Sequence, residues 1–270
     1  DKGARKWKDS LGRKPSSKPL ELPSLLRPYQ KQGVEWIQQL LKMGCHALLA
    51  DEMGLGKTLQ VLSLLHARKV KDLPDLVVCP ASVVPVWQGE IDRFFPGTKV
   101  EVLKSGNDFS MGLTPRLWIA SYTQLRRHKH LLKDAKFGHV VLDEAQNIKN
   151  PDAKVTQSCF AIQGKHRIVL TGTPVENTPM DLWSLFRFLM PGLLGGRKAF
   201  EDGLTNGNPS FLENLRTQIS PFTLRRTKKQ VAKDLPEKVE SIVKCPLSEA
   251  QRAEYGKILQ NGVQELGEDV

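Results

Sequence analysis

Six short apolar segments between residues 46 and 173 restrict most strongly how this chain can fold. Each is of strand length and almost continuously apolar, which indicates a strand buried on both faces. Helical or loop sequence separates each segment from the next, as in a parallel sheet that helices cover on both faces. We therefore predict an α/β domain with a mainly parallel sheet. The segments are HALLA, DLVVCP, VEVL, LWIASY, HVVLDE and RIVLTGT.

Periodicity and capping residues indicate three helices outside these segments. Pro28 suits the first turn of a helix in which apolar residues recur until Gly44 ends it. Residues 58–70 carry leucines on one helical stripe and suit the first crossover between strands. Ser248 and Gln251 form a capping-box pattern, which predicts a helix that runs to the end of the sequence.

Chemically distinctive residues follow directly after five of the apolar segments. In an open α/β sheet, ligands bind outside the carboxyl ends of the strands, so these five motifs should converge on one edge of the sheet. The motifs are Asp51–Thr58, Pro80–Ser82, Ser121–Thr123, Asp143–Gln146 and Thr171–Pro174.

The first of these motifs contains the loop GLGKT, which is typical of phosphate binding. Gly54 and Gly56 would let backbone N–H groups point into a concavity, Lys57 would reach the β- and γ-phosphates, and Thr58 would place its hydroxyl on Mg²⁺. The usual pattern has a further glycine six residues before the lysine, and Asp51 stands there instead. A simple glycine-rich turn is the alternative interpretation of the loop taken alone.

The motif VVLDEAQ supplies the complementary chemistry. At the end of a buried strand, Asp143 can hold the shell of a magnesium ion and Glu144 can orient an attacking water. In LTGTP, the hydroxyls that flank Gly172 could link these carboxylates to movement of the protein, although a plain turn would explain that segment alone. Gln30 is a candidate for the adenine edge, and an exposed helical glutamine is the commoner explanation.

Charge and cysteine content narrow the class of protein. The chain carries 40 Lys and Arg against 29 Asp and Glu, a net charge of +11, which favours a polyanionic partner, nucleic acid before an acidic membrane. No run of about 18 apolar residues is present, which argues against a membrane span. The four cysteines include no C-x-x-C pair and indicate reduced thiols in an intracellular compartment. They are Cys45, Cys79, Cys159 and Cys245.

Composition divides the chain into four predicted parts. Residues 1–22 are rich in Lys, Arg, Ser and Pro and should form a basic linker or arm. Residues 23–190 should form the core, 191–222 a helical protrusion, and 223–270 a basic return segment with the C-terminal helix. The opening DKGARKWKDS has neither an initiator Met nor an apolar signal core, which is typical of a segment cut from a longer protein.

Together, these segments resemble the first RecA-like lobe of the Swi/Snf-type DNA translocase ATPases of helicase superfamily two, over roughly residues 25 to 260. That family writes its phosphate loop as DEMGLGKT, so the resemblance identifies the loop as a nucleotide site. It rests on segments that occur in the family's order. They are LRPYQKQGVEWI, LLADEMGLGKTLQ, LVVCPASVVPVWQGE, IASYTQL, VVLDEAQNIKN, LTGTPVENTPMDLWSL and FTLRRTKKQVAKDLPEK.

The resemblance implies a RecA-like P-loop fold with ATP and Mg²⁺ at the site. It implies that Lys57, Asp143 and Glu144 are catalytic, and that Thr58 and Asp143 are the metal ligands. The residues implied to bind the nucleotide are Gln30, Asp51, Gly54, Leu55, Gly56, Lys57, Thr58 and Gln146, and those implied in coupling are Thr171, Gly172 and Thr173.

The resemblance also implies double-stranded DNA as the partner, contacted mainly through its phosphates, so that binding is independent of base sequence and weakens with salt. Arg225 and Arg226, with Lys228 and Lys229, could equally form a solvated basic face. The residues implied in DNA binding are Pro80, Ala81, Ser82, Ser121, Tyr122, Thr123, Arg225 and Arg226.

The sequence departs from the family in two ways. Gln146 stands where histidine is commoner, and we expect it to tune the site without abolishing activity. Nothing after Lys238 resembles the second lobe, which carries the family's arginine fingers, and such fingers contribute on the order of 10³ to 10⁵ in rate. We therefore expect this chain alone to bind ATP weakly and hydrolyse it poorly, and a two-lobed parent to be a DNA-stimulated ATPase.

Two other functions remain open at this point. A strand-separating helicase of a neighbouring family would share the nucleotide motifs, and a catalytically silent lobe could serve as a docking module for nucleic acid or protein. Intact Lys57, Asp143 and Glu144 argue against the silent lobe. The amino-acid sequence of the segment VENTPMDLWSLFRFLMPG favours a bacterial member of the family, and hence a location in the bacterial cytoplasm or nucleoid over a eukaryotic nucleus.

Overall fold

The computed structural model describes residues 20–105, 109, 115–173, 178–205, 209–231 and 245–266. Contacts between residues divide the chain into two units, residues 1–233 and residues 234–270, which are described separately here. Most of the predicted basic arm and the end of the LTGTP motif, Pro174, lie outside the described residues. The predicted domain boundaries stay predictions.

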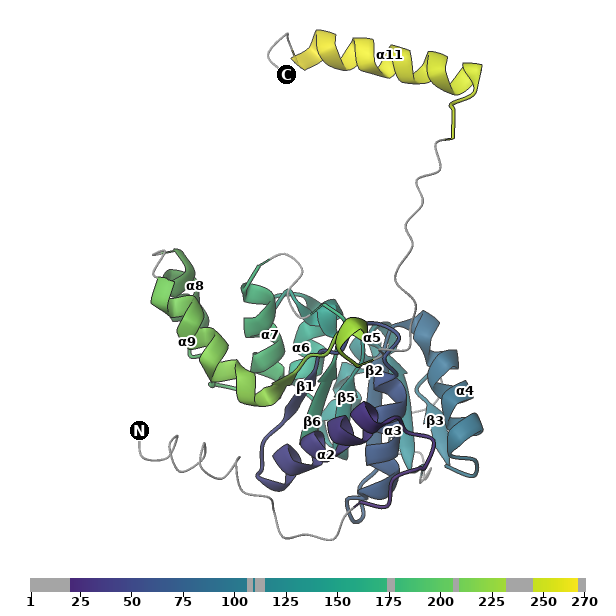
Figure 1. The fold of residues 1–270 in the computed structure, drawn as a ribbon, viewed down its shortest axis with the longest axis vertical. Coiled ribbons are helices and arrows are strands. Elements are labelled where there is room, and N and C mark those ends of the chain that lie inside the picture. The colour runs from purple at the N-terminus through teal and green to yellow at the C-terminus, as the bar shows by residue number, and fades with distance from the viewer. Residues whose placement is uncertain are drawn as a thin grey trace. The chain divides into compact units, whose positions relative to one another are not determined.

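The larger unit is built on a seven-stranded sheet in the order β3-β4-β2-β5-β6-β1-β7 (Figure 1). All of its pairings are parallel, which confirms the predicted sheet. Each of the six predicted apolar segments overlaps one strand, although β5 and β6 begin before their segments, and β7 was not predicted. The strands are β1 (Ala47–Leu49), β2 (Asp75–Cys79), β3 (Val100–Val102), β4 (Leu117–Ser121), β5 (Lys136–Leu142), β6 (Gln163–Leu170) and β7 (Thr223–Leu224).

Helices cover both faces of this sheet, as predicted for buried parallel strands (Figure 1). Helix α3 contacts α2 and α4 in one layer, and α6 contacts α5 and α7 in the other. The first layer consists of α2 (Pro28–Lys42), α3 (Lys57–Ala67) and α4 (Val84–Phe94), and the second of α5 (Tyr122–Arg127), α6 (Lys154–Phe160) and α7 (Met180–Leu189). Short 3₁₀ helices are η1 (Ala81–Val83), η2 (Lys129–Lys133), η3 (Ala145–Ile148) and η4 (Ser220–Phe222).

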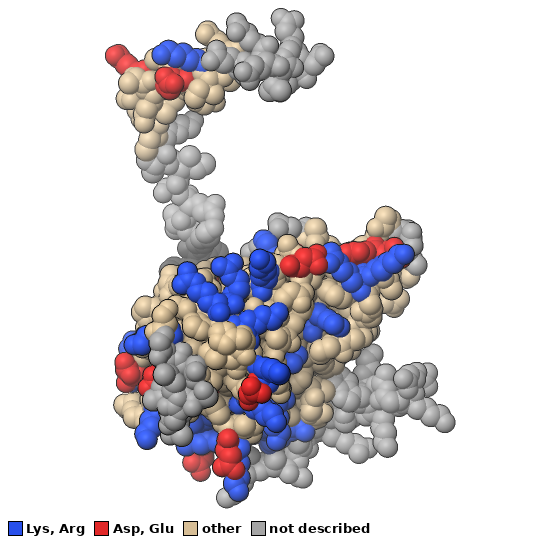
Figure 2. All heavy atoms as spheres, turned by 180° about the vertical axis from the view of Figure 1, so that it is seen from behind, with Lys and Arg blue, Asp and Glu red and all other residues tan. Residues whose placement is uncertain are grey.

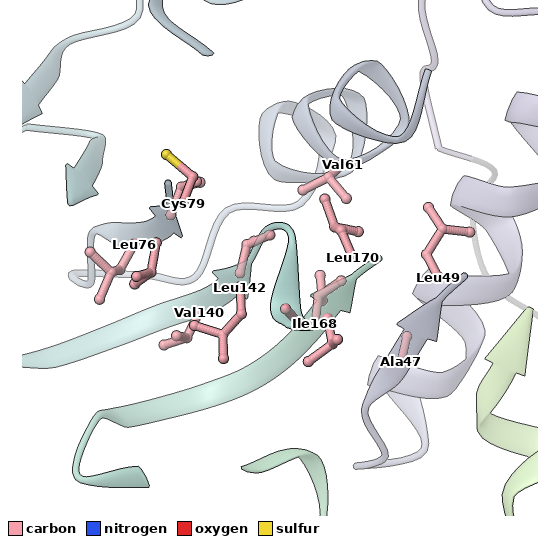
Figure 3. Packing of buried hydrophobic residues seen from close by; sticks show 14 of the residues in the cluster. Ala47, Leu49, Val61, Leu76, Cys79, Val140, Leu142, Ile168 and Leu170 are labelled. Carbon is pink, nitrogen blue, oxygen red and sulfur yellow. The ribbon is translucent and has the colours of Figure 1, made fainter. Parts of the chain in front are cut away.

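The hydrophobic core lies between the sheet and these two layers. Figure 3 shows strand side chains such as Leu76, Val140 and Ile168 packed side by side, with Val61 of α3 placed against Leu170. All five are fully buried, which is why the strands read as continuous apolar runs. Truncating one such side chain to alanine costs about 2–5 kcal/mol, so this core holds the strand ends in place.

The remaining helices lie after α7. Helices α8 (Arg197–Thr205) and α9 (Pro209–Ile219) share a small apolar cluster with α7, formed by Trp183, Phe200 and Leu215. They are followed by α10 (Lys228–Val231). In the smaller unit, α11 (Glu249–Leu266) begins with the predicted capping box. No helix in the described part of the chain is long and apolar enough to cross a membrane.

Candidate functional site

The loop between β1 and α3 has the backbone shape that its glycines predict. Gly54 and Gly56 have φ angles of +84° and +70°, in the left-handed region that favours glycine, and α3 begins at Lys57. A Cβ atom on Gly56 would lie 2.5 Å from Nε2 of Gln30. Left-handed glycines in front of a helix N-terminus are the arrangement that allows main-chain N–H groups to bind a phosphate, and a side chain at position 56 would crowd Gln30.

Lys57, the first residue of α3, is buried beside this loop. Its Nζ donates a hydrogen bond to the main-chain oxygen of Asp51 at 2.8 Å. Burial lowers the pKa of Lys57, while the nearby carboxylates of Glu144 and Asp143 raise it. The ammonium group is therefore held close to the phosphate loop and to the acidic motif at the same time.

Gln30 borders the same loop from α2. Its Oε1 accepts a hydrogen bond from the main-chain N–H of Arg27 at 2.9 Å, and its Nε2 donates to the oxygen of Leu55 at 3.2 Å. The hydroxyl of Tyr29 donates to the same oxygen at 3.1 Å. Gln30 thus lies beside the loop, as its predicted role requires, and it also caps its own helix.

Asp143 is buried at the end of β5, and both of its carboxylate oxygens accept hydrogen bonds. Oδ2 accepts from Nε1 of Trp87 at 2.8 Å, and Oδ1 accepts from the N–H of Glu144 at 2.9 Å. Burial raises the pKa of Asp143, and the hydrogen bond from Trp87 opposes this shift. The hydroxyl of Tyr122 donates to the main-chain oxygen of Asp143 at 2.8 Å. The position of this carboxylate is therefore determined by several elements at once.

A chain of hydrogen bonds joins the acidic motif to the threonine motif. Nε2 of Gln146 donates to Oε2 of Glu144 at 2.9 Å, and Oγ1 of Thr171 donates to Oε1 of Gln146 at 3.2 Å. The N–H of Thr173 donates to Oγ1 of Thr171 at 3.1 Å. The side chain of Gln146 thus connects the acidic motif to the threonine motif.

The two segments predicted to touch DNA lie side by side, because Cys79 of β2 pairs with Ser121 of β4. In the first segment Ala81 and Ser82 are exposed, and Thr123 is exposed in the second. Ser121 and Tyr122 are instead buried, and Oγ of Ser121 accepts from the N–H of Gln124 at the start of α5. The expectation that both residues face DNA needs correction, because Ser121 caps a helix and Tyr122 points inward to Asp143.

Arg226 is used inside the lobe. Strand β7 pairs with β1 and brings Arg226 to the buried carboxylate of Asp51, with Nε and Nη2 at 2.9 and 2.5 Å from its oxygens. Nη2 also donates to Oε1 of Gln60 at 2.9 Å, and Nη1 donates to the main-chain oxygen of Tyr29. Two predictions are affected as a result. Arg226 pairs with a buried acid within the lobe, so its contact with DNA stays a prediction, and the carboxylate of Asp51 is occupied by Arg226, so Asp51 meets Lys57 through its carbonyl.

Arg225 contacts the segments that follow β1 and β6. Its Nη1 donates to the oxygens of Ala50 and Gly172 at 3.1 and 2.9 Å, although the residue is exposed. A short segment late in the sequence therefore fastens the phosphate loop to the threonine motif.

Sequence reasoning did not assign a role to Trp87, Glu90 or Gln60. Trp87 and Glu90 lie one turn apart on α4, and Glu90 has a pKa raised by burial and by the nearby Asp143. Gln60 is fully buried and donates to Asp51 at 3.3 Å. The sequence signal that could have indicated a role for Trp87 was its position on the helix that follows the Pro80–Ser82 motif. Its hydrogen-bond partner, Asp143, lies 56 residues further along the chain and could not be predicted from that position.

The chain resembles known proteins in sequence. It matches the SNF2-related domain family over residues 29–269. It is 38% identical to an uncharacterized ATP-dependent helicase of Mycoplasma genitalium, covering 90% of this chain and 24% of that protein. It is 35% identical to the TATA-binding protein-associated factor MOT1 of Saccharomyces cerevisiae, covering 90% of this chain and 15% of that protein. The chain thus spans a quarter or less of the length of these relatives.

A solved structure is similar as well. The SWI2/SNF2 ATPase core of Sulfolobus solfataricus, in complex with double-stranded DNA, superposes with a TM-score of 0.74 at 37% identity, over 92% of this chain and 55% of that one. These likenesses confirm the resemblance that the sequence motifs indicated and agree with the parallel α/β fold. The chain is a member of the SNF2-related domain family.

Proposed function

We propose that this chain is the ATP-binding lobe of an ATP-dependent translocase that moves along double-stranded DNA. The observation that carries the proposal is the edge of the sheet where the glycine loop, Lys57, the buried Asp143 and the Gln146–Thr171 link meet. The names of two matched proteins support it, since one is an ATP-dependent helicase and the other an ATPase core in complex with double-stranded DNA.

The residues at this edge fit a nucleotide. The loop at Gly54 and Gly56 would hold phosphates through main-chain N–H groups, and a side chain at Gly56 would collide with Gln30. Lys57 would exchange its bond to the carbonyl of Asp51 for one to a phosphate. Gln30, at the rim of the loop, would meet the adenine edge.

The oxygen donors at this edge also fit Mg²⁺, which prefers carboxylate, hydroxyl and phosphate oxygens. Thr58 would supply its hydroxyl and Asp143 its carboxylate. A cation would favour the charged form of Asp143, whose pKa burial raises. When bound, Mg²⁺ would neutralise charge that develops on the phosphates.

The remaining residues of the site would orient the attacking water and transmit movements of Glu144 to other parts of the lobe. Glu144 would accept a hydrogen bond from the attacking water and hold it in line with the phosphate. Gln146 would pass any shift of Glu144 to Thr171, to which it is already bonded. Arg225, at the oxygen of Gly172, would carry the same shift to β7.

DNA would bind beside this site at the exposed residues of the two adjacent segments, Ala81, Ser82 and Thr123. Lys and Arg side chains are spread over the face of the lobe in Figure 2, with fewer acidic side chains between them. Contacts of this kind are mainly to phosphates, so affinity should fall steeply with salt and depend little on base sequence. A place in the bacterial cytoplasm or nucleoid remains a prediction from the sequence, since matched relatives come from bacteria and from a yeast.

The test is ATP turnover by this chain, with and without duplex DNA, beside the same chain followed by a second RecA-like lobe. We expect turnover only with both lobes and DNA, because the family resemblance assigns the arginine fingers to a second lobe, and such fingers contribute on the order of 10³ to 10⁵ in rate. Glu144→Gln should bind ATP and lose turnover, and full turnover in that variant would contradict the assigned role. A two-lobed protein that carries Glu144→Gln, has no turnover and still keeps full activity in vivo would favour a silent docking lobe. DNA-independent turnover by the single lobe would show that the finger is misassigned.

A second candidate, strand separation, is favoured by the helicase name of the Mycoplasma relative. A strand-displacement assay on forked DNA distinguishes the two functions, since a translocase on duplex DNA consumes ATP without releasing a strand. Release of the labelled strand in step with ATP consumption would support the helicase.

A further inference from the structure

Near each segment proposed to contact DNA lies a buried aromatic residue whose side chain donates a hydrogen bond to Asp143. Trp87 lies five residues after the exposed Ser82, on α4, and is fully buried. Its Nε1 donates to Oδ2 of Asp143 at 2.8 Å. Tyr122 immediately precedes the exposed Thr123, and its hydroxyl donates to the main-chain oxygen of Asp143 at 2.8 Å. Two separate paths therefore run from the proposed DNA surface to one acidic residue.

The sheet holds these paths together. Strands β4, β2 and β5 are neighbours, so both segments and Asp143 lie at adjacent strand ends. The N–H of Asp143 also donates to the oxygen of Val78 in β2 at 2.8 Å. Trp87, Tyr122 and Asp143 are buried, and because protein interiors are closely packed, a displacement of the start of α4 or of α5 should be passed on to neighbouring groups.

The two carboxylate oxygens of Asp143 are held from different sides. Oδ1 is bonded within the acidic motif by the N–H of Glu144, whereas Oδ2 is bonded by Trp87, which belongs to the helix behind the first DNA segment. A hydrogen bond from a buried donor to a carboxylate is among the stronger ones in proteins and has a defined direction. The direction of Oδ2 therefore depends on where α4 lies.

We propose that Trp87 and Tyr122 are positioning residues that report DNA contact to the metal-binding carboxylate, so that duplex DNA and Mg²⁺-ATP bind cooperatively. This inference rests on the proposed function. Coupling between two sites is reciprocal and typically amounts to about 5–150-fold in affinity. Trp87 and Tyr122 would transmit this coupling without touching either ligand.

The experiment measures binding by this chain, so turnover is not required. The dissociation constant of a fluorescent ATP analogue with Mg²⁺ is determined with and without saturating duplex DNA, and the ratio of the two constants is the coupling. We expect a ratio of about 5 or more in the unmodified chain. Trp87→Phe keeps a buried aromatic ring and removes the donor, and should bring the ratio close to one, while the dissociation constant for DNA alone changes little. Tyr122→Phe removes only a hydroxyl and should lower the ratio in part.

Trp118→Phe is the matched control. Trp118 is also a buried tryptophan, at 1% exposure, but it lies near the start of β4, away from the strand ends that form the site. This variant should keep the ratio of the unmodified chain. A ratio that falls equally in Trp118→Phe would show a general loosening of the fold and overturn the inference.

The remaining outcomes separate the inference from the proposed function. Unchanged coupling in both Trp87→Phe and Tyr122→Phe would overturn the inference. If ATP and DNA both bind the unmodified chain but the ratio of the two ATP dissociation constants is one, only the inference is overturned. If neither ligand binds, the proposed function is overturned as well. Thermal denaturation is recorded for every variant, and if Trp87→Phe does not fold, Tyr122→Phe decides the result.

Discussion

The buried pair of Arg226 and Asp51 allows a quantitative prediction. The side chain of Asp51 is fully buried and that of Arg226 is 12% exposed. Arg226→Met keeps most of the volume of the side chain but leaves the carboxylate of Asp51 without its cation. Removing one partner of a buried ion pair costs about 3–5 kcal/mol, a large share of the roughly 5–15 kcal/mol by which a domain is stable.

The surroundings of Asp51 place the expected loss near the lower end of that range. Two donors would remain in the variant, the main-chain N–H of residue 226 at 3.1 Å and Nε2 of Gln60 at 3.3 Å. We therefore expect a loss of about 3 kcal/mol in the free energy of unfolding. For a domain of this size, each kcal/mol shifts the melting midpoint by roughly 2–4 °C, so the midpoint should fall by roughly 6–12 °C.

Circular dichroism during heating measures this midpoint. Adding Asp51→Asn to Arg226→Met removes the unpaired charge and should recover much of the loss, which identifies charge burial as the cause. Arg197→Met is the control, because Arg197 forms a pair of similar length with Asp152 at 2.7 Å in an exposed position, where solvent screening leaves little effect. A shift in Arg226→Met no larger than that of the control would refute the reasoning.

Three further changes test the site and the fold. Lys57→Ala should weaken ATP binding by about tenfold or more, because a charged hydrogen bond to phosphate contributes roughly 1.5–3 kcal/mol; equal affinity in equilibrium dialysis would contradict the assignment. Gly56→Ala should weaken ATP binding and lower the free energy of unfolding. Gly97 has a φ of +84° with open space around it, so Gly97→Ala should lower the free energy of unfolding only by the strain of the left-handed backbone, about 1–2 kcal/mol. Equal losses of stability in the two variants would show that crowding at the loop is unimportant. Burial lowers the pKa of His46 to about 4 and of His166 to about 3 from 6.5, so the unfolded chain takes up these protons first. Stability should therefore be full above pH 6.5 and fall as the pH drops toward 4, by up to about 1.4 kcal/mol per pH unit for each histidine, and a flat urea-denaturation profile from pH 7 to pH 5 would contradict this.

Local sequence was sufficient for the strands and for the phosphate loop. A strand buried on both faces is apolar throughout, so HVVLDE and DLVVCP can be predicted as strands without knowledge of the residues that they contact. Gly56 was equally readable, since a left-handed residue at a helix start favours glycine. From these strands follows the edge at which the five motifs meet, because the carboxyl ends of parallel strands lie together.

Strand β7 could not be predicted in this way. It has only two residues, Thr223 and Leu224, too few to show any periodicity, and its place beside β1 is set by pairing across 175 positions of the chain. The sequence showed that Arg226 belongs to a basic segment, which suggested DNA. Only the fold showed that Asp51 is buried within reach of Arg226. A buried carboxylate requires a cationic partner, so Arg226 pairs with Asp51.

The sequence by itself thus determined the kind of sheet, the loop shape and the residue types at the site, because these depend on short-range periodicity and on the conformational range of glycine. The tertiary structure decided which groups those residues meet. Trp87 donates to Asp143 and Arg226 pairs with Asp51 because a buried N–H or carboxylate must find a partner in space, and that partner can stand anywhere along the chain.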